Sequence, residues 1–387
     1  KNRNNYRLND TFTSISLGMM SRFPAYLQLG VQGLVYAFIW NQFNLGLLNA
    51  YTPFIWVLAF VLYDLSYYWL HRCHHEIKFL WASHVVHHHG EEFNLSTALR
   101  QTGTDFIFKW VFYTPMLFLG VPPEIFVTVA ALNLIYQFWV HTEHIDRLGI
   151  LDYIFVTPSN HRIHHAQNKE YIDANYGGVF IIWDILFGTF KDEKKELKPV
   201  YGTSKPLKSW NPFWANFEVW TEIFKDTWRT KSWKDKLRVW ISRPKWRPKD
   251  VSEKYPIQKN DLKVFKKYDP KVTLFAKIFG FGQLAFGSFY SQAFFFNASS
   301  MGSTEIFLIG VNVTMILVFA SLLFEGKAFG YPLEVIRAAL VLFAIYFGQF
   351  EFMQLTILIH ALICGVLAGY MTINNKPAEF NEARSES

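Results

Sequence analysis

Cysteine and charge are both scarce in this chain of 387 residues. Its two cysteines are Cys73, which lies among histidines, and Cys364, which lies in an apolar stretch. This arrangement excludes the disulfide framework of small secreted proteins and agrees with a reducing compartment. Charged residues make up 18% of the chain, against 51% hydrophobic and 19% aromatic residues. Soluble domains have about 25% charged residues, so the composition favours a membrane protein.

Long apolar runs are present instead. A helix needs about 20 mainly apolar residues to cross a bilayer. Eight stretches approach this length, and the stretches 25–40 and 106–119 are short enough to be tilted or partly interfacial. We therefore predict an all-α fold, a polytopic membrane helical bundle. The eight predicted spans are 25–40, 54–70, 106–119, 124–140, 272–296, 306–324, 333–347 and 352–371.

The net charge of +7 is unevenly distributed. Lysine and arginine concentrate in the loops that carry histidines and in the stretch 191–267, whereas the connections 41–50, 120–123 and 297–303 have neither. The positive-inside rule then places the histidines on the cytosolic face of the membrane. The basic stretch is expected to contact anionic membrane lipids, and no recognition module suggests that it binds nucleic acid.

Three regions are predicted along the chain. Residues 1–190 form a histidine-bearing domain with two membrane hairpins, and residues 270–387 form a C-terminal membrane bundle. Between them, residues 191–269 are rich in Trp and Lys and suit an interfacial helix, with a loop-rich cytosolic cover as the alternative. The lone His360 in the C-terminal bundle is interpreted as a hydrogen-bonded interior residue, because it has no partner at ligand spacing.

The histidines indicate a metal centre. Of the thirteen, all but His360 lie between positions 71 and 165. Residues three and four apart share a helix face, so each cluster is able to aim its imidazoles at one point. Two hairpins that return to one side of the membrane bring the segments 71–100 and 141–165 together. The clusters are HxxxH at His71 and His75, HxxHH at His84, His87 and His88, His141 directly after a span, and HxxHH at His161, His164 and His165.

These nine imidazoles exceed the needs of one tetrahedral zinc, whereas two iron ions with open positions would use most of them. We therefore predict a histidine-rich diiron cap on the cytosolic face. His74, His89 and His144 fall outside the minimal pattern and are expected to be supporting or surface residues.

Nearby carboxylates are candidates for orienting the histidine rings. Glu76 follows the first cluster directly, Glu143 stands two residues after His141, and Asp184 lies downstream. We take Glu76 and Glu143 as the catalytic candidates. Each of the three also has a plainer interpretation as a surface or structural charge.

The motifs resemble those of the fatty acid hydroxylase and sterol desaturase superfamily of membrane diiron enzymes. Within it, the chain is most similar to the alkylglycerol monooxygenase family, whose order of segments it follows. Asn160 departs from that pattern, where a histidine is frequent, and so do the additional histidines at positions 74, 89 and 144. The matching segments are YYWLHRCHHE, NLSTALRQ, YQFWVHTE, TPSNHRIHH, IDANYGG and IIWDILFGTF.

The resemblance implies the chemistry. It makes His71, His75, His84, His87, His88, His141, His161, His164 and His165 the iron ligands, and Glu76 a residue needed for activity. It implies that O2 is used to hydroxylate the carbon next to the ether oxygen of an alkylglycerol. The resulting hemiacetal collapses to a fatty aldehyde and glycerol. Tetrahydrobiopterin is the implied electron donor, with no residues assigned to it, and the endoplasmic reticulum is the implied membrane.

Two other functions stay open at this point. A diiron sterol or fatty acyl hydroxylase or desaturase, fed by a cytochrome b5-type donor, would share the histidines but not the NLSTALRQ and HTE contexts. A membrane scaffold or transport protein with a structural zinc cluster would need fewer histidines than the chain has.

Overall fold

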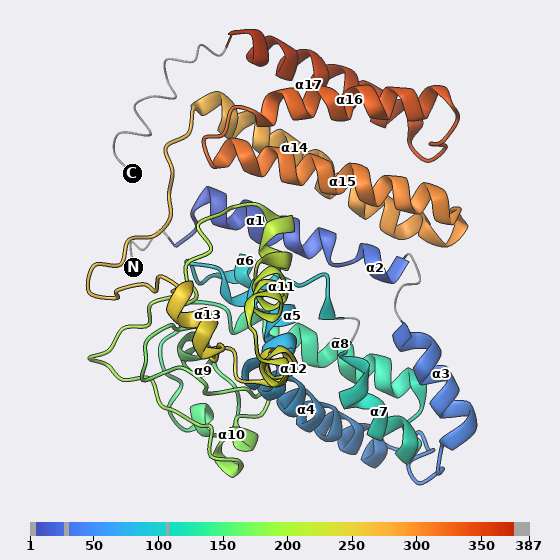
Figure 1. Ribbon diagram of the computed structural model, residues 1–387. Coiled ribbons are helices and arrows are strands. Elements are labelled where there is room, and N and C mark those ends of the chain that lie inside the picture. Colours follow the sequence, from blue (N-terminus) through green and yellow to red (C-terminus); the bar gives the residue numbers. More distant parts are fainter. Residues whose placement is uncertain (1–4, 27–30, 106–107, 375–387) are drawn as a thin grey trace. The chain divides into compact units, whose positions relative to one another are not determined.

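The computed structural model describes residues 5–26, 31–105 and 108–374 (Figure 1). Over these residues the protein is helical and has no β-strand, with isolated bridges at Phe155–Phe180 and Ala166–Tyr201. The predicted all-α class is therefore confirmed. The chain divides into two units: Lys1–Lys208 with Trp214–Tyr268, and Ser209–Phe213 with Asp269–Ser387.

The first unit is built around a long helix that ends in histidines. Helix α4 (Pro53–Glu76) packs against α7 (Trp110–Leu119) and α8 (Pro123–Trp139), and α3 (Val31–Phe43) packs against α7. The side chain of Thr52 caps α4 by accepting a hydrogen bond from the backbone N–H of Ile55 at 3.4 Å. Helices α4, α7 and α8 share an apolar core that consists of Ile55, Ala59, Tyr63, Leu70, Tyr113, Met116, Val121, Ile125, Phe126 and Val129.

The two connections between these helices lie side by side. The backbone N–H of Leu45 donates to the carbonyl of Phe118 at 2.9 Å. Gly120 has a φ of +92°, and a Cβ atom there would lie 2.6 Å from the Asn44 side-chain oxygen, so only glycine fits this turn. The α3–α4 and α7–α8 connections therefore share one end of the helical layer, and the histidine-bearing C-terminal ends of α4 and α8 lie at the other.

Shorter helices and loops build the cap beyond those C-terminal ends. A buried carboxylate, Asp64 of α4, ties one of these loops to the helical layer. It accepts hydrogen bonds from the backbone N–H groups of Val179 and Phe180 at 2.8 and 2.9 Å. The cap elements are α5 (Lys78–His88), α6 (Leu95–Ala98), η2 (Gly149–Tyr153), α9 (Pro158–His164) and α10 (Ile182–Leu186), with α1 (Leu8–Met20) and α2 (Phe23–Tyr26) before them.

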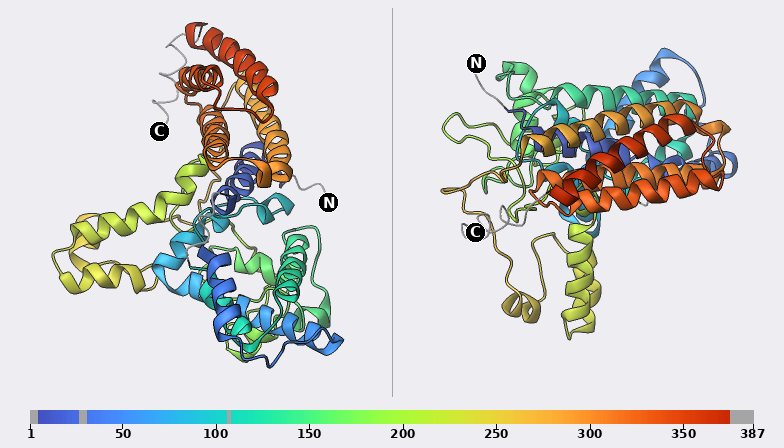
Figure 2. Two further views of the ribbon diagram at one scale, coloured as in Figure 1. Left: turned by 90° about the vertical axis from the view of Figure 1, so that its right-hand side faces the viewer. Right: turned by 90° about the horizontal axis from the view of Figure 1, so that it is seen from above.

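A helical hairpin follows the cap. It consists of α11 (Pro212–Arg229) and α12 (Trp233–Ile241), and α13 (Lys249–Lys254) comes after it (Figure 2). Ser232 caps α12 by accepting a hydrogen bond from the Asp235 N–H at 3.2 Å. Val219, Ile223 and Val239 of the hairpin pack against Ala82 and Val85 of α5.

The second unit is a bundle of four helices: α14 (Leu274–Asn297), α15 (Ser303–Phe324), α16 (Gly330–Tyr346) and α17 (Gln354–Asn374). Successive helices pack against each other, and the short η3 (Ala298–Ser300) follows α14. Its interior holds a buried polar network in which Arg337 contacts Glu334 and donates to Asn312 Oδ1 at 2.7 Å. His360 faces Gln283 Oε1 at 2.9 Å, so it is hydrogen-bonded inside the bundle.

Among the described residues, three helices are long and apolar enough to cross a membrane: α4, α15 and α17. They correspond to the predicted spans 54–70, 306–324 and 352–371. The other predicted spans form helices that are shorter or less apolar, and residues 27–30 and 106–107 of two of them lie outside the described residues. The protein is thus an integral membrane protein by its apolar helices, while the count of eight spans stays a prediction.

Candidate metal centre

The structure brings the nine histidines of the predicted pattern together in two groups. Within each group, the potential ligand nitrogens all lie within 4.8 Å of one another. The two groups adjoin, because the rings of His88 and His165 stack with their centroids 4.4 Å apart. The first group is His71, His75, His84, His88 and His164, and the second is His87, His141, His161 and His165.

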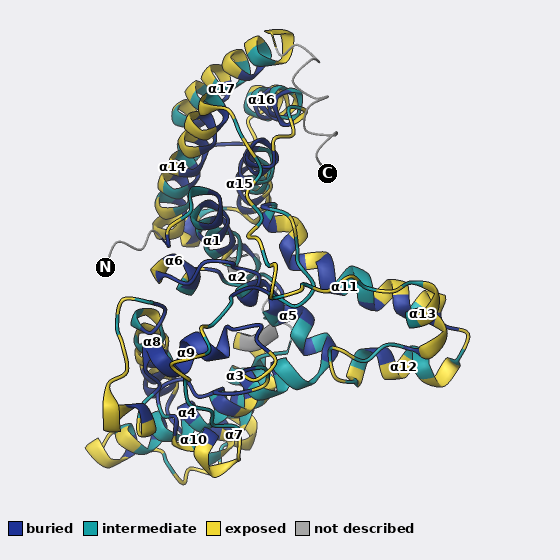
Figure 3. Ribbon diagram, turned by 90° about the vertical axis from the view of Figure 1, so that its left-hand side faces the viewer, coloured by how far each residue is buried: buried dark blue, intermediate teal, exposed yellow. Residues whose placement is uncertain are grey.

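Local breaks in the helices let the clusters converge. Ile77 separates α4 from α5 with extended dihedral angles (φ −116°, ψ 122°), so α5 turns its histidines toward those at the end of α4. Helix α9, buried throughout (Figure 3), starts at a capping box. There the Asn160 side chain accepts the Thr157 N–H at 2.9 Å. Asn160, which departs from the family pattern, thus completes the capping box from the third position of the helix, and Thr157 is the N-cap.

Backbone carbonyls orient the imidazole rings. In four of the nine histidines, Nδ1 lies within hydrogen-bond distance of a main-chain oxygen and therefore donates to it. Such a bond fixes the ring and leaves Nε2 as the metal-facing atom. The pairs are His71 with Tyr176 at 2.8 Å, His87 with Arg100 at 3.1 Å, His141 with Gln137 at 2.8 Å, and His164 with Ala174 at 2.9 Å.

The second group fits a cation at its centre. His87 and His141 both donate Nδ1–H to a carbonyl, so a neutral ring presents a bare lone pair at Nε2 in each case. These two Nε2 atoms face each other at 3.3 Å, where no proton is available for a hydrogen bond. In the first group, Nε2 of His75 and of His164 is buried with no hydrogen-bond partner among the described residues. A bound metal ion satisfies both arrangements.

Burial keeps these rings neutral. It lowers the pKa of His87 to about 4 and the pKa of His164 to about 3. Burial also lowers the pKa of His88 and His165 well below the ordinary value. Neutral imidazole is the form that binds a metal, so the site is prepared for metal binding at neutral pH.

The NLSTALRQ segment supports the second group. Asn94 caps α6 by accepting the Ser96 N–H at 2.9 Å, and this short helix leads to Arg100. The Arg100 carbonyl orients His87, and its guanidinium donates Nε–H to the Val86 carbonyl at 2.9 Å. Arg100 is almost fully buried, and Asp10 of α1 lies 3.5 Å from it. The sequence resemblance singled out this segment, and the structure gives it a physical role.

Asp184 supports the first group indirectly, through the backbone at Tyr176. Its carboxylate accepts the N–H groups of Tyr176 and Gly177 at 2.8 and 2.7 Å. The Tyr176 carbonyl in turn accepts from His71, so Asp184 fixes the peptide that orients a candidate ligand. Burial raises the pKa of Asp184 to about 6. The centroid of the Tyr176 ring also lies 5.3 Å from that of the His75 ring, so Tyr176 is next to the first group.

The two catalytic candidates lie at the edge of the site. Glu76, on α4, accepts a hydrogen bond from Arg72 Nε at 3.1 Å and is partly exposed. Glu143 accepts from the Tyr201 hydroxyl at 2.9 Å, and Tyr201 stacks on Phe93, which lies against the second group. Neither carboxylate contacts a histidine ring in the hydrogen bonds of the described residues, and their part in activity stays a prediction.

The remaining histidines of the region lie outside both groups. His74 is buried and its Nδ1 faces the Leu70 carbonyl at 2.7 Å. His89 is buried with Nε2 3.8 Å from Glu218, and His144 is exposed. These positions agree with the supporting and surface roles expected for them.

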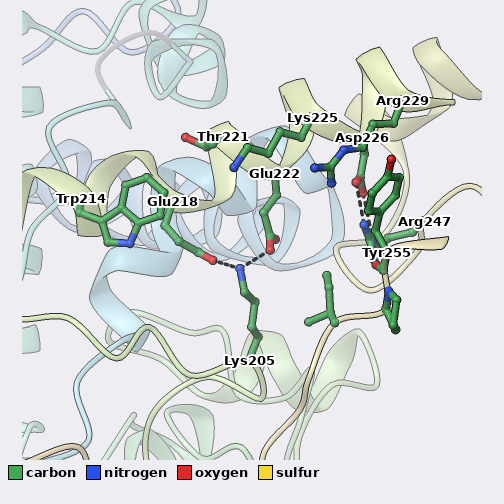
Figure 4. A pocket seen from close by; sticks show the side chains of 12 residues that line it. Lys205, Trp214, Glu218, Thr221, Glu222, Lys225, Asp226, Arg229, Arg247 and Tyr255 are labelled. Carbon is green, nitrogen blue, oxygen red and sulfur yellow. Dashed lines mark hydrogen bonds and ion pairs between the residues drawn. The ribbon is translucent and has the colours of Figure 1, made fainter. Parts of the chain in front are cut away.

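A separate cavity of about 220 Å³ lies beside α11 (Figure 4). Most of its charges are paired with one another: Lys205 contacts Glu218 and Glu222, and Arg247 contacts Asp226. These five charged groups therefore have partners within the protein. It lies outside the histidine groups.

Sequence reasoning missed two residues that build the site, Asp64 and Arg100. A signal for Asp64 was present, because an acidic residue inside an apolar run is costly unless it has partners. For Arg100 the signal was its place in the NLSTALRQ segment. For the orienting carbonyls there was none, since every residue carries a carbonyl and only the fold decides which one meets an imidazole.

Comparisons of the sequence with known proteins identify its relatives. The sequence profile of the fatty acid hydroxylase family matches residues 56–189, which span both histidine groups. The alkylglycerol monooxygenase of Xenopus tropicalis is 38% identical over 339 residues, covering 87% of this chain and 75% of the relative. That of Homo sapiens is 34% identical over 349 residues, covering 89% and 77%. The alkylglycerol monooxygenase of Danio rerio is 42% identical over 242 residues, covering 62% and 54%. No solved structure gives a significant match.

Proposed function

Since this chain belongs to the alkylglycerol monooxygenase family and is a membrane monooxygenase of lipids, we propose that it cleaves the ether bond of alkylglycerols. The carbon next to the ether oxygen is hydroxylated with O2 and with electrons from tetrahydrobiopterin. The hemiacetal product then collapses to a fatty aldehyde and glycerol.

One observation carries the proposal: nine neutral imidazoles form two adjoining groups at the end of an apolar helix. One structural zinc needs four ligands, so two groups of five and four favour two metal ions. We propose that the ions are iron and that the nine histidines are the ligands, because imidazole sites with open positions suit iron enzymes that activate O2. Bound iron would supply the activation of O2 and the oxidation of the C–H bond.

The protein's own residues position the site. Carbonyls hold His71, His87, His141 and His164 by Nδ1, which aims Nε2 at the metal positions and fixes the tautomer. The end of α4 carries His71 and His75 directly after an apolar stretch, so a long alkyl chain is able to reach them from the bilayer. Its glycerol head would stay at the interface, where polar groups of the cap are available.

We also propose the orientation and location of the protein. The connections at the end of the layer away from the histidines carry no Lys or Arg, which supports a cytosolic position for the metal centre. The endoplasmic reticulum is the proposed membrane. In this layout residues 1–190 hold the diiron domain, 191–269 the interfacial segment and 270–387 the C-terminal bundle.

The test starts with the purified full-length protein. Iron and zinc are measured first, and the protein is then incubated with an alkylglycerol, O2 and tetrahydrobiopterin while aldehyde is followed. We expect about two irons per chain and aldehyde that depends on the pterin. Iron without ether cleavage would favour a sterol or fatty acyl hydroxylase with a protein electron donor, and zinc without turnover would favour a structural site.

Variants assign the residues. His87→Ala removes a candidate ligand of the second group, and Glu76→Ala removes the carboxylate next to His75; both are expected to abolish turnover. His144→Ala is the matched control, because this histidine is exposed and lies outside both groups. Full activity in the His87 or the Glu76 variant would show that the corresponding assignment is wrong.

A further inference from the structure

Each of the two helices of the α11–α12 hairpin exposes large apolar side chains along one face. Phe224 is 59% exposed and Trp228 87% on α11, and on α12 the values are 81% for Trp233, 75% for Leu237 and 67% for Ile241. Their spacing of four residues places them on one face of each helix. We call these five residues the apolar stripe. Large apolar side chains that gather on exposed helix faces mark an interaction site rather than a random scatter of apolar residues.

The stripe is distinct from the face that anchors the hairpin. Ile223 and Val239 are not part of the stripe and are buried against Ala82 and Val85 of α5. The hairpin therefore has its own core contact and still leaves a second apolar side outside. An amphipathic helix with one packed face is expected to be polar on the rest of its surface in water. In this hairpin, part of the remaining surface is apolar.

The base of the hairpin lies where a candidate membrane span ends. The carbonyl of Ser242, directly after α12, accepts the backbone N–H of Lys78 at 2.8 Å. The Lys78 ammonium donates to the Trp246 carbonyl at 2.7 Å. Lys78 stands two residues after Glu76, the last residue of α4. The hairpin is thus fixed directly after the C-terminal end of α4.

The hairpin also runs across the span rather than along it. In Figure 1, α4 lies in the plane of the picture while α11 and α12 are seen nearly end on, and in Figure 2 the hairpin extends sideways. A helix that crosses the direction of a membrane span lies along the membrane surface. This is the orientation in which one apolar side faces acyl chains.

The charge of the hairpin matches an anionic surface. Between positions 224 and 245 the sequence has eight basic and two acidic residues. One of the acidic residues, Asp226, is buried and paired with Arg247, so it adds little negative charge to the surface. The basic residues are Lys225, Arg229, Lys231, Lys234, Lys236, Arg238, Arg243 and Lys245. Anionic lipid headgroups attract such a cluster when it lies near the membrane surface.

We propose that the α11–α12 hairpin lies in the membrane interface, with the apolar stripe among the acyl chains and the basic residues on anionic headgroups. Trp228 and Trp233, close to the tip, take the interfacial position that tryptophan prefers in membrane proteins. The hairpin then anchors the cap against the bilayer from the side, in addition to the spans. The proposal is independent of the metal and of the substrate.

The test uses the full chain in lipid nanodiscs with an environment-sensitive fluorophore on a single cysteine. Cys73 and Cys364 are first replaced by serine, and Leu237→Cys places the label on the stripe. Glu253→Cys, on α13 after the hairpin, is the control, since its side chain is 66% exposed and lies outside the stripe. Trp228→Cys repeats the test on α11. Iron content and melting temperature equal to those of the parent verify that each variant is folded.

We expect the Leu237 and Trp228 labels to emit at shorter wavelength than the Glu253 label. Nitroxide groups high on the lipid acyl chains should quench them at least twofold more strongly. Omitting anionic lipid should lower this quenching. Labels that are quenched by aqueous iodide as strongly as the control, and not by lipid nitroxide, would overturn the proposal. Labels shielded from both quenchers would overturn it in favour of a protein contact, and equal quenching without anionic lipid would refute the role given to the basic residues.

Discussion

Replacing Asp64 by Asn tests how the cap is fastened to the helix that carries His71 and His75. The Asp64 carboxylate is fully buried and accepts four hydrogen bonds. Asn133 Nδ2 at 2.7 Å and the Val179 N–H at 2.8 Å donate to Oδ1. The Phe180 N–H and Trp183 Nε1–H, each at 2.9 Å, donate to Oδ2. All four donors lie in segments distant from Asp64 in sequence, so this one side chain joins three parts of the unit.

An asparagine of the same shape has one acceptor oxygen and one amide group that donates. In either orientation of the amide, two of the four N–H donors face another donor. Hydrogen bonds to charged groups contribute about 1.5–3 kcal/mol each, so the loss of two costs at least about 3 kcal/mol. For a unit of this size, that corresponds to a melting temperature about 6–12 °C lower.

The assay is thermal unfolding in detergent together with iron analysis. Because the loop held by Asp64 also carries the Tyr176 carbonyl that orients His71, we expect the Asp64→Asn protein to retain less iron as well. Asp192→Asn is the control, because Asp192 pairs with Arg147 at the surface, where such pairs contribute about 0–1 kcal/mol. An Asp64→Asn protein with unchanged melting temperature and full iron content would refute the reasoning.

Three further predictions concern packing, charge and pH. In Gly178→Ala, the new Cβ would lie 2.8 Å from both Asp64 Oδ1 and Tyr67 Cδ1, so the melting temperature should fall. Gly282→Ala is the control: no atom lies within 4 Å of its new Cβ, so the melting temperature should stay the same or rise. Arg337→Leu leaves the buried Glu334 carboxylate of the C-terminal bundle without its charged partner. The free energy of unfolding should fall by about 3–5 kcal/mol. The double variant Arg337→Leu/Glu334→Leu should recover most of the lost stability. If the single and the double variant lose the same stability, the ion pair does not have the role given to it. Finally, burial lowers the pKa of His87 to about 4 from 6.5, so the folded protein binds fewer protons than the unfolded chain between these values. Stability and iron retention should therefore be complete above pH 6.5 and fall as the pH drops toward 4, and a flat melting temperature across that range would count against buried neutral ligands.

The sequence predicted the class of fold and the nine residues of the two histidine groups because both depend on local patterns. Apolar runs identify α4, α15 and α17, and spacings of three and four identify the histidine faces. The division into groups of five and four was not predictable. It depends on the break at Ile77 and on the placement of α9, which bring His164 to the first group and His161 to the second.

The supporting contacts were predicted less well. Carboxylates were expected to orient the rings, but backbone carbonyls face Nδ1 in His71, His87, His141 and His164. A carbonyl carries no sequence signal. Asp184 was a candidate for direct contact, and it acts instead on the peptide of Tyr176. The basic, Trp-rich stretch after residue 191 did indicate an amphipathic segment, which the structure describes as the α11–α12 hairpin.

Mössbauer spectroscopy of the full-length protein loaded with 57Fe, combined with metal analysis, tests the central claim most directly. The account predicts about two irons per chain that are magnetically coupled. It also predicts that His75→Ala, in the first group, and His161→Ala, in the second, each lose iron while the exposed His144→Ala keeps it. A single uncoupled metal ion, zinc in place of iron, or unchanged iron in both group variants would contradict it.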